Sequence, residues 1–352
     1  MLDQFIALLP QEIDGVMIVS PVNRFFFTDF ESSDGILIAS KNGSIFFTDS
    51  RYIEAAQDKI TCCEVRELTQ TKEQLPAVLT ELGIETLGAE GDRLTVNELK
   101  AYSEMTAPVT ITCDGIDALI DRVRTVKTQW QLQRIIAAQR IAERAFEHIL
   151  GFIHEGVTEK EIALELDYYM LKNGADALSF ETIAVSGANT SKPHGVPTDK
   201  AVQAGDFITM DFGAVVEGYH SDMTRTVAVG EISDEQRKVY ATVLRAQLAA
   251  LETLKEGLPC REGDAAARAV IAEEGYGAFF RHGTGHGVGV EIHEKPNLSP
   301  RAQINLQSGN IVTVEPGIYI PGKFGVRIED MVMITPDGCK NLTYADKNLI
   351  LL

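Results

Sequence analysis

Short hydrophobic runs alternate with amphipathic stretches through the first third of the chain. The runs 15–20, 35–39, 44–48, 86–89 and 109–113 are mostly apolar or β-branched, a composition that predicts β-strands. Stretches 75–82 and 96–105 carry apolar residues at helical spacing. Lys41, Asn42 and Gly43 lie between two of the runs and are typical of a hairpin turn. This order predicts an α/β domain with a core of its own.

Four longer helices are predicted in the rest of the chain. The first has one apolar face, made by Leu132, Ile135, Ile136, Ala142, Ala145, Phe146 and Ile149. A capping box from Thr158 to Glu161 opens the second helix, which Gly174 ends. A third helix follows Ser233, and a fourth is predicted to begin at Asp264. Two β runs, 207–212 and 219–229, follow the second helix and are joined by a turn at 217–218.

The length of the chain predicts more than one domain. A chain of 352 residues is long for a single hydrophobic core. The charged stretch 121–127 precedes the first long helix, so we place the boundary there and predict domains at 1–122 and 123–352. An apolar fraction of 45% is ordinary for a globular protein and allows a sizeable core.

The net charge limits the expected binding partners, and the cysteine content indicates the expected cellular compartment. A formal net charge of −19 disfavours nucleic acid and anionic membranes as partners. The N-terminal stretch includes Asp3, Glu12 and Asp14 without a basic region, and no apolar run approaches the ~20 residues of a membrane helix. The five cysteines are odd in number and form no C-x-x-C pair, which suits free thiols in a reducing compartment. We therefore expect a cytoplasmic protein.

Four carboxylates and one histidine have the chemistry of a divalent-metal site: Asp211, Asp222, His286, Glu315 and Glu329. The hairpin formed by runs 207–212 and 219–229 would place Asp211 and Asp222 roughly opposite each other. Two carboxylates that close repel each other unless a cation lies between them. For any single acidic residue a surface role is the more ordinary interpretation, but Asp211 lies in an apolar run, and a buried carboxylate needs a partner.

The remaining three residues lie where the backbone can bring them to the same place. His286 stands between two glycines, so the chain can pass close to an ion. Glu315 and Glu329 each follow an apolar run, and a turn at 321–322 would fold the second run back onto the first. Oxygen ligands with one imidazole suit Mn²⁺, Co²⁺, Fe²⁺ or Zn²⁺, and four carboxylates suffice to bridge two ions about 3.5–4 Å apart. The pattern favours a dinuclear hydrolase.

The motifs around these residues resemble one family. DFG, SDMTRT, HGTGHGVG, EPGIY and RIED, in this order, are similar to the M24 metallopeptidases of pita-bread fold, and most similar to their Xaa-Pro peptidases, prolidase and aminopeptidase P. SFETIAVSGANTSKPH and RFFFTDFESSDGILIAS extend the resemblance to nearly the whole chain. It implies an α+β fold: a pita-bread catalytic domain of two similar halves, and a smaller creatinase-like α/β N-terminal domain that covers a partner subunit's active site. A homodimer is therefore expected.

The resemblance also implies roles for the metal-site residues. Asp211 would chelate one ion, His286 and Glu315 would hold the other, and Asp222 and Glu329 would bridge the two. Mn²⁺ is the expected metal, with Co²⁺, Zn²⁺ or Fe²⁺ as alternatives. Glu315 would also take a proton from the attacking water.

Further residues are candidates for handling the substrate, a peptide with proline in second position. By resemblance, His194 and His293 act on the substrate and the developing oxyanion, and His282 lines the proline pocket. Phe180 is a candidate for the same pocket, with core packing as the alternative. Arg327 is a candidate substrate-binding residue, although a salt bridge to a ligand carboxylate is the favoured interpretation.

The sequence thus predicts a metal-dependent peptidase that cleaves before proline. The alternatives are a methionine aminopeptidase, which shares the ligand types, and an inactive pita-bread module that only binds. Whether the substrates are dipeptides or longer peptides stays open. His220 lies on the same side of its strand as Asp222 but is not required by the family motif, so we leave it out of the ligand set.

Overall fold

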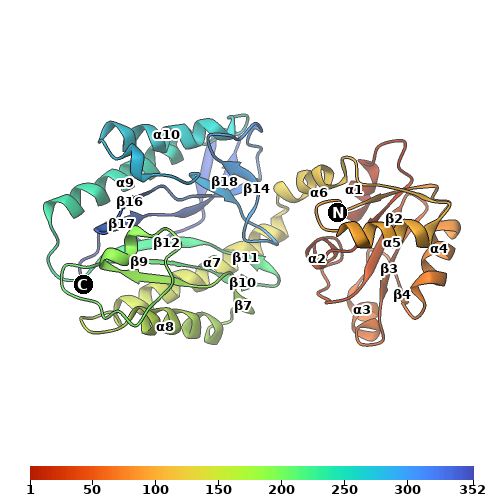
Figure 1. The fold of residues 1–352 in the computed structure, drawn as a ribbon, viewed down its shortest axis with the longest axis horizontal. Helices are drawn as coiled ribbons and strands as arrows, with labels where there is room; N and C mark the ends of the chain where they lie inside the picture. Colours follow the sequence, from red (N-terminus) through yellow and green to blue (C-terminus); the bar gives the residue numbers. More distant parts are fainter. The chain divides into compact units, whose positions relative to one another are not determined.

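The computed structural model describes residues 1–352 and divides into two compact units, Met1–Arg124 and Thr125–Leu352 (Figure 1). Each unit has its own hydrophobic core and is described by itself. None of the helices is both long enough and apolar enough to cross a membrane.

The N-terminal unit is built on a six-stranded mixed sheet with the order β4-β3-β2-β1-β5-β6. Its strands are β1 (Gly15–Ile18), β2 (Ile36–Ser40), β3 (Gly43–Thr48), β4 (Glu64–Glu67), β5 (Thr86–Ala89) and β6 (Thr110–Thr112). Strands β1, β2 and β3 are antiparallel neighbours, whereas β4, β5 and β6 join by parallel pairing. The predicted turn is confirmed, because Ser40 pairs with Gly43 across it.

The helices of this unit are α1 (Leu2–Ala7), α2 (Pro21–Thr28), α3 (Ile53–Lys59), α4 (Thr71–Glu81), α5 (Val96–Thr106) and α6 (Ile116–Thr125). Leu75, Val78 and Leu79 of α4 join the core formed by the sheet. Helix α4 begins earlier than the predicted 75, because the Gln74 side chain accepts hydrogen bonds from the amides of Thr69 and Gln70 and fixes the entry of the helix. The charged stretch 121–127 is not a linker throughout, since α6 continues to Thr125.

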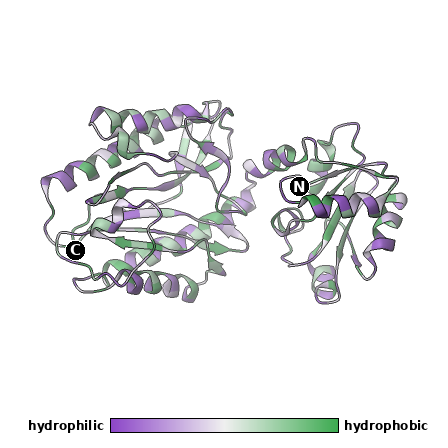
Figure 2. Ribbon diagram, viewed as in Figure 1, coloured by the Kyte–Doolittle hydropathy of each residue, from purple (hydrophilic) through white to green (hydrophobic).

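The C-terminal unit contains four long helices, α7 (Gln129–Leu150), α8 (Glu159–Lys172), α9 (Asp234–Thr253) and α10 (Cys260–Glu273), and two short 3₁₀ turns, η1 (Gly187–Ser191) and η2 (Gly277–Phe279). In Figure 1, α10 lies above the strands of this unit and α8 lies below them. Two helices followed by strands occur twice along the chain, as the sequence predicts. Figure 2 shows the strands as mostly hydrophobic and the helices as mixed, which fits helices that cover the sheets with one face.

The strands of this unit form four sheets. They are β7 (Ala177–Leu178), β8 (Ile183–Ser186), β9 (Phe207–Phe212), β10 (Ala214–Val216), β11 (Tyr219–His220), β12 (Met223–Ala228), β13 (Gly285–Gly287), β14 (Glu294–Leu298), β15 (Ile311–Val314), β16 (Gly317–Ile320), β17 (Phe324–Arg327), β18 (Asp330–Thr335) and β19 (Gly338–Asn341). The sheet orders are β11-β10-β7, β12-β9-β8, β14-β13-β15-β18-β19 and β16-β17. One core lies between α7, α8 and the first half's strands, and another lies between α9, α10 and the second half's strands.

Capping fixes the starts of three of the long helices. The side chains of Thr158 and Ser233 take part in capping boxes at α8 and α9, and at α7 the Gln131 side chain accepts a hydrogen bond from the Thr128 amide. The predicted start of the fourth helix at Asp264 is wrong, because α10 begins at Cys260. Asp264 lies inside the helix with its carboxylate buried, where it accepts hydrogen bonds from Thr284.

The run 219–229, predicted as one strand, is divided in two. Glu217 and Gly218 both have positive φ, at 47° and 75°, and form the expected turn between β10 and β11. Strand β11 pairs with β10, whereas β12 pairs with β9. The chain therefore changes sheet at Ser221 and Asp222.

Candidate metal centre

The five predicted metal-site residues come from both halves of the C-terminal unit and line one cavity of about 550 Å³. Asp211 lies in β9, and Asp222 immediately precedes β12. His286 is the central residue of β13, Glu315 follows β15, and Glu329 lies between β17 and β18.

The register of the first hairpin differs slightly from the prediction. Asp211 pairs with Thr224 rather than with Asp222, so the two aspartates are diagonal neighbours. Side chains alternate along a strand, so Asp222 and Thr224 point to the same side. The carboxylates of Asp211 and Asp222 therefore still meet in one cavity.

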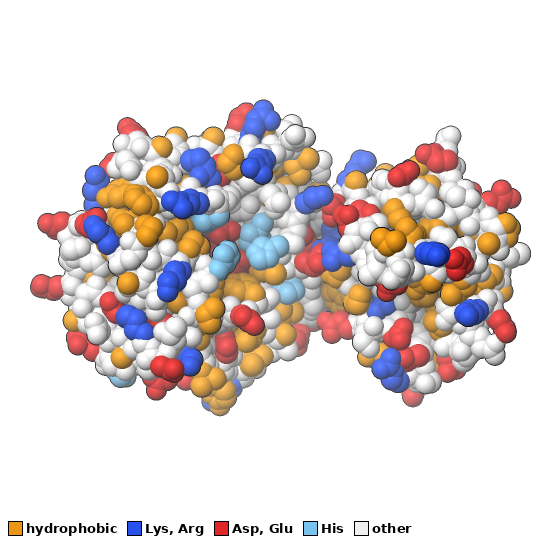
Figure 3. Space-filling model, viewed as in Figure 1, with side chains coloured by type: hydrophobic (Ala, Val, Ile, Leu, Met, Phe, Trp, Pro, Cys, Tyr) orange, Lys and Arg blue, Asp and Glu red, His pale blue; other side chains and the backbone are white.

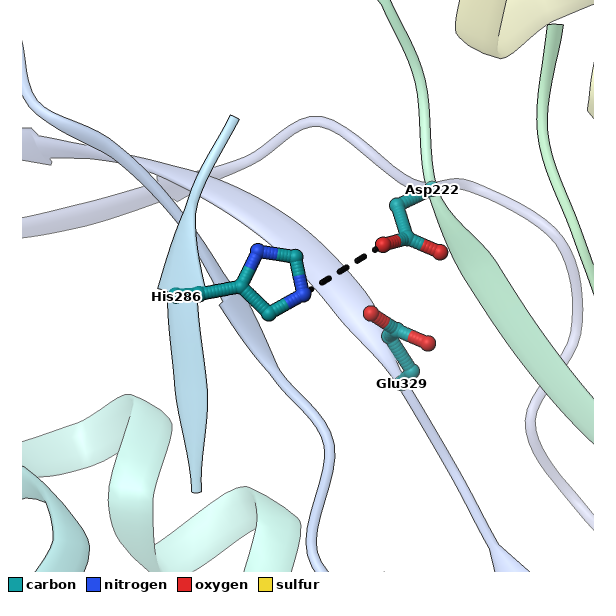
Figure 4. A group of neighbouring side chains, drawn as sticks. All are labelled: Asp222, His286 and Glu329. Atoms are coloured by element: carbon teal, nitrogen blue, oxygen red, sulfur yellow. Dashed lines mark ion pairs between the residues drawn. The ribbon is translucent and has the colours of Figure 1, made fainter. Parts of the chain in front are cut away.

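Ligand atoms of Asp222, His286 and Glu329 lie within 4.8 Å of one another (Figure 4). The Nε2 atom of His286 is 3.5 Å from Asp222 Oδ2 and 3.4 Å from Glu315 Oε1. Its Nδ1 atom lies 3.0 Å from the carbonyl oxygen of Gly287, a contact that orients the ring and directs Nε2 toward the carboxylates.

Close backbone packing holds His286 in place. A Cβ atom on Gly285 would lie 1.9 Å from the Thr313 carbonyl oxygen, and one on Gly287 would lie 2.3 Å from that of Lys295. Only glycine fits at these two positions, so β13 can approach both neighbours. The Thr313 hydroxyl accepts a hydrogen bond from the His286 amide and donates one to Glu315 Oε1.

Asp211 and Glu329 each have one hydrogen-bonded oxygen and one without a partner, whereas Asp222 Oδ2 only faces His286 Nε2 at 3.5 Å. Thr224 Oγ1 donates to Glu329 Oε2 at 2.6 Å, and Arg327 Nη2 lies 2.5 Å from Asp211 Oδ2. The atoms Asp211 Oδ1, Asp222 Oδ1 and Glu329 Oε1 are buried and have no hydrogen-bond partner. Buried oxygens of this kind are costly unless a donor or a cation faces them.

The electrostatics of the cavity fit a cation. Burial raises the pKa of Asp222 and of Glu329 well above the usual range, and repulsion from neighbouring carboxylates adds to the shift. Burial also raises the pKa of Glu315 to about 7 and lowers that of His286. A divalent ion among these groups would favour the ionised carboxylates and the neutral imidazole. The donor set therefore matches a hard or borderline divalent metal.

The predicted substrate residues line the same cavity: Phe180, His194, His282, His293 and Arg327. Figure 3 shows histidine side chains gathered around a hollow in the surface of the C-terminal unit. The rings of His286 and His293 lie edge to face, with centroids 4.3 Å apart. The histidine next to the ligand set is therefore close enough to act on a group bound there.

A chain of hydrogen bonds joins Asp211, a predicted ligand, to His282 through Arg327 and Tyr319. Arg327 Nη1 donates to the Tyr319 hydroxyl at 3.0 Å, and this hydroxyl is 3.0 Å from His282 Nε2. Arg327 Nε also donates to Thr224 Oγ1 at 3.0 Å. The guanidinium is thus occupied by protein groups, which fits the salt bridge to a ligand carboxylate better than a direct contact with substrate. Burial lowers the pKa of His282 to about 4, so its imidazole is neutral near pH 7.

His220 does not line the cavity. Its Nδ1 atom lies 2.9 Å from the Ser179 hydroxyl, and its amide donates to the Gly289 carbonyl. Its absence from the predicted ligand set agrees with this geometry.

Sequence reasoning missed three supporting residues: Thr224, Thr313 and Tyr319. Thr224 and Thr313 are each two positions from a ligand on a strand, so period-two alternation would have placed them beside it. Tyr319 carries no such signal, because no sequence pattern connects a tyrosine to an arginine and a histidine in distant segments.

Comparison with models of known protein families identifies the family of this chain. Residues 133–336 match the model of metallopeptidase family M24, and residues 7–126 match the creatinase/prolidase N-terminal domain. The chain belongs to metallopeptidase family M24. Family membership implies divalent metal ions and agrees with the donor set in the cavity. The α+β fold with a pita-bread catalytic domain and a creatinase-like N-terminal domain is thereby confirmed.

Relatives match over almost their full length. The chain is 37% identical to a Xaa-Pro dipeptidase of Pyrococcus furiosus over 96% of this chain and 95% of that protein. The solved structure of a Xaa-Pro dipeptidase from Bacillus anthracis is 41% identical, with a TM-score of 0.96, and covers 100% of this chain and 99% of the other. That of an X-Pro aminopeptidase from Thermotoga maritima is 37% identical, with a TM-score of 0.93, over 100% and 99% of the two chains.

Proposed function

We propose that the chain is a metal-dependent Xaa-Pro peptidase that hydrolyses the bond between an N-terminal residue and proline. The observation that carries the proposal is the single cavity in which all five ligand-type residues and three further histidines meet. Full-length similarity to Xaa-Pro dipeptidases and to an X-Pro aminopeptidase supports the same substrate class.

The proposed metal set is Asp211, Asp222, His286, Glu315 and Glu329. Four carboxylates and one imidazole suffice for two divalent ions, with Asp222 and Glu329 as the bridging ligands. Manganese is the proposed metal, and Co²⁺, Zn²⁺ or Fe²⁺ would suit the same donors. Such ions supply a water of lowered pKa and polarise the carbonyl oxygen of the scissile bond.

The protein's own groups then bind the substrate and move protons. Glu315 takes the proton of the attacking water, a role that suits a carboxylate in the cavity beside His286. His293, beside His286, donates a hydrogen bond to the developing oxyanion, and His194 orients the substrate. His282 and Phe180 form the side of the cavity that accepts the proline ring.

The bond before proline explains why a metal site suits this substrate. That bond has no N–H group, and the ring fixes φ near roughly −65°. A peptidase that relies on a hydrogen bond from this N–H would lose the contact. Activation of the carbonyl side, combined with a pocket for the ring, does not depend on it.

The proposal is tested with three peptides and stripped enzyme. Ala-Pro, Ala-Pro-Ala and Met-Ala-Ser are offered separately after reloading with Mn²⁺, Co²⁺ or Zn²⁺. We expect hydrolysis of an Ala-Pro substrate, a sharp fall on N-acetylation, and loss of activity with a chelator. Cleavage of Met-Ala-Ser with both proline peptides intact would replace the proposal by methionine aminopeptidase activity.

The same assay addresses the finer alternatives. Comparison of Ala-Pro with Ala-Pro-Ala separates a dipeptidase from an enzyme for longer peptides. No hydrolysis of any peptide by metal-loaded protein would favour an inactive binding module. The expected homodimer and the cytoplasmic location remain predictions from the family resemblance and the composition.

A further inference from the structure

The loop that carries His194 has little regular structure. It follows β8, begins with the 3₁₀ turn η1, and reaches the isolated bridge at Ala201. Pro193, His194 and Val196 line the cavity from this loop. Arg327 Nη1 donates to the Pro193 carbonyl at 3.3 Å, and the position of the His194 ring otherwise depends on the groups that hold the loop on either side of it.

One carboxylate contacts both sides of the loop. Glu159, the first residue of α8, accepts hydrogen bonds through Oε1 from the Ser186 amide at 2.6 Å and from Asn189 Nδ2 at 3.0 Å. Its Oε2 accepts from the Thr198 amide at 2.9 Å and from the Thr198 hydroxyl at 2.6 Å. Asn189 precedes His194 and Thr198 follows it, so the carboxylate closes the segment between them.

The Glu159 side chain is suited to this task by charge and burial. The residue is 0% exposed. Burial alone would raise the pKa of Glu159, but the hydrogen bonds from Thr198, Asn189 and Ser186 outweigh this effect and hold it below its usual range. Hydrogen bonds to an ionised acceptor are shorter and stronger than neutral ones. The hydrogen bonds to the Glu159 carboxylate therefore stabilise the position of an otherwise irregular segment.

We propose that Glu159 is a positioning residue for the Xaa-Pro peptidase reaction, which acts by fixing the loop that presents His194 to the substrate. The inference rests on the function proposed above. Glu159 itself lies outside the cavity, so its effect on turnover is indirect. A second tie, from Lys200 Nζ to Ser186 Oγ at 2.8 Å and to Asp206 at 2.6 Å, holds only the base of the loop.

The first arm of the test needs no substrate. Glu159→Gln keeps the shape of the side chain but removes its charge and presents an NH₂ group to hydrogen-bond donors. We expect amide hydrogen exchange at Thr198 and across the loop to rise at least about tenfold, with β9 and β12 unchanged. The matched control is Glu161→Gln, two residues further on the same helix. Its side chain bonds only Thr158, and glutamine suits a capping box, so the loop should exchange as in the wild type.

The second arm measures coupling to His194. Glu159→Gln should lower kcat/KM for an Xaa-Pro substrate about tenfold without loss of bound metal, whereas Glu161→Gln should leave it unchanged. In a His194→Ala background, the same Glu159→Gln change should lower kcat/KM less than about twofold, because the group it positions is already gone. A purely structural role would lower kcat/KM by the same factor in both backgrounds.

The two arms separate the possible failures. Unchanged loop exchange in Glu159→Gln overturns the proposal, as do equal effects in the two backgrounds or metal loss that parallels the loss of activity. If the wild type cleaves no Xaa-Pro substrate, the proposed function fails, and the exchange arm alone still decides whether Glu159 fixes the loop. If cleavage is seen but exchange is unaffected, the function stands and the positioning role does not.

Discussion

At the scale of single residues, the most informative feature is a group of three buried carboxylate oxygens that have no hydrogen-bond donor. Asp211, Asp222 and Glu329 each have one buried oxygen without a hydrogen-bond partner, although Asp211 and Glu329 accept a hydrogen bond through the other oxygen. A fold that only needed to pack would not concentrate such atoms in one cavity, because each costs about 1–3 kcal/mol or more. A bound cation would offset this free-energy cost by neutralising the carboxylates.

The first prediction concerns two of these carboxylates. Asp222→Asn or Glu329→Gln should lower bound metal and abolish turnover, because each removes a proposed bridging ligand. The metal-free variants should unfold at a temperature no lower than that of the metal-free wild type, because a buried repulsion has been removed. Elemental analysis and thermal melts measure both effects. Glu235→Gln, a surface residue paired with Lys323, is the control. Undiminished metal in both variants, with activity retained, would remove them from the site.

The second prediction concerns His220. His220→Asn should keep at least about a tenth of wild-type kcat/KM, a loss of no more than about 1.4 kcal/mol. The reason is that the ring contacts Ser179 and lies outside the cavity. Kinetics and metal content are measured beside those of His286→Ala. A loss as large as that of His286→Ala, with metal loss, would show that His220 belongs to the ligand set.

At this scale the sequence predicts which residues are candidate ligands but not which residues hold them in place by hydrogen bonds. Asp211 lies in an apolar run, where a buried carboxylate needs a partner, and His286 lies between two glycines that let the backbone approach an ion. The link from Arg327 through Tyr319 to His282 depends on how three distant segments meet, and the closing of the His194 loop by Glu159 depends on contacts between a helix and a loop. No periodicity carries that information.

At the scale of elements, a buried ion pair joins β12, β18 and the C-terminal segment. Arg225 Nη2 lies 2.8 Å from Asp330 Oδ1, and both side chains are 1% exposed. Arg225 also donates to the carbonyls of Ala345 and Asp346. Asp330 accepts further hydrogen bonds from Lys347, Gln247 and Asn341.

The third prediction follows from this pair. Arg225→Met should lower the free energy of unfolding by about 3–5 kcal/mol, because it removes one partner of a buried charge pair and leaves carbonyls without donors. Urea unfolding of metal-free protein measures the change. Arg245→Ala, which removes an exposed partner of Glu274, should change it by less than about 1 kcal/mol. Equal stability of the two variants would show that Arg225 does not tie these strands together.

Helices and turns were predicted better than strand partners. The capping box at Thr158, the helix start after Ser233 and the turn at 217–218 depend on interactions between residues close in sequence, and the structure confirms them. The predicted start of α10 is wrong because Asp264 is a residue type typical of helix N-caps. Its carboxylate instead accepts a hydrogen bond from Thr284, which lies in a loop distant in sequence. The division of 219–229 was missed because the run is continuously compatible with a strand, and only the competing partners β10 and β9 break it.

At the scale of the whole molecule, the two units have separate cores and only one of them holds the proposed metal centre. The core of Met1–Arg124 is formed by its own sheet and helices. The five proposed ligands all lie in Thr125–Leu352. A ligand that binds only the folded form stabilises the unit that binds it by mass action. Metal should therefore stabilise the two units unequally.

The last prediction is a calorimetric one. Stripping the metal should lower the unfolding temperature of the C-terminal unit and leave that of the N-terminal unit unchanged. At a free metal concentration of about 100 times Kd, binding adds about 2.7 kcal/mol to the stability of the unit that holds the ion. At about 2–4 °C per kcal/mol for a unit of this size, this corresponds to a shift of roughly 5–11 °C, so the two transitions can be followed separately. Asp222→Asn should lack the metal-dependent shift altogether, whereas Glu235→Gln should keep it. A shift of both transitions would mean that the units unfold as one, and no shift in the wild type would remove the metal from the cavity.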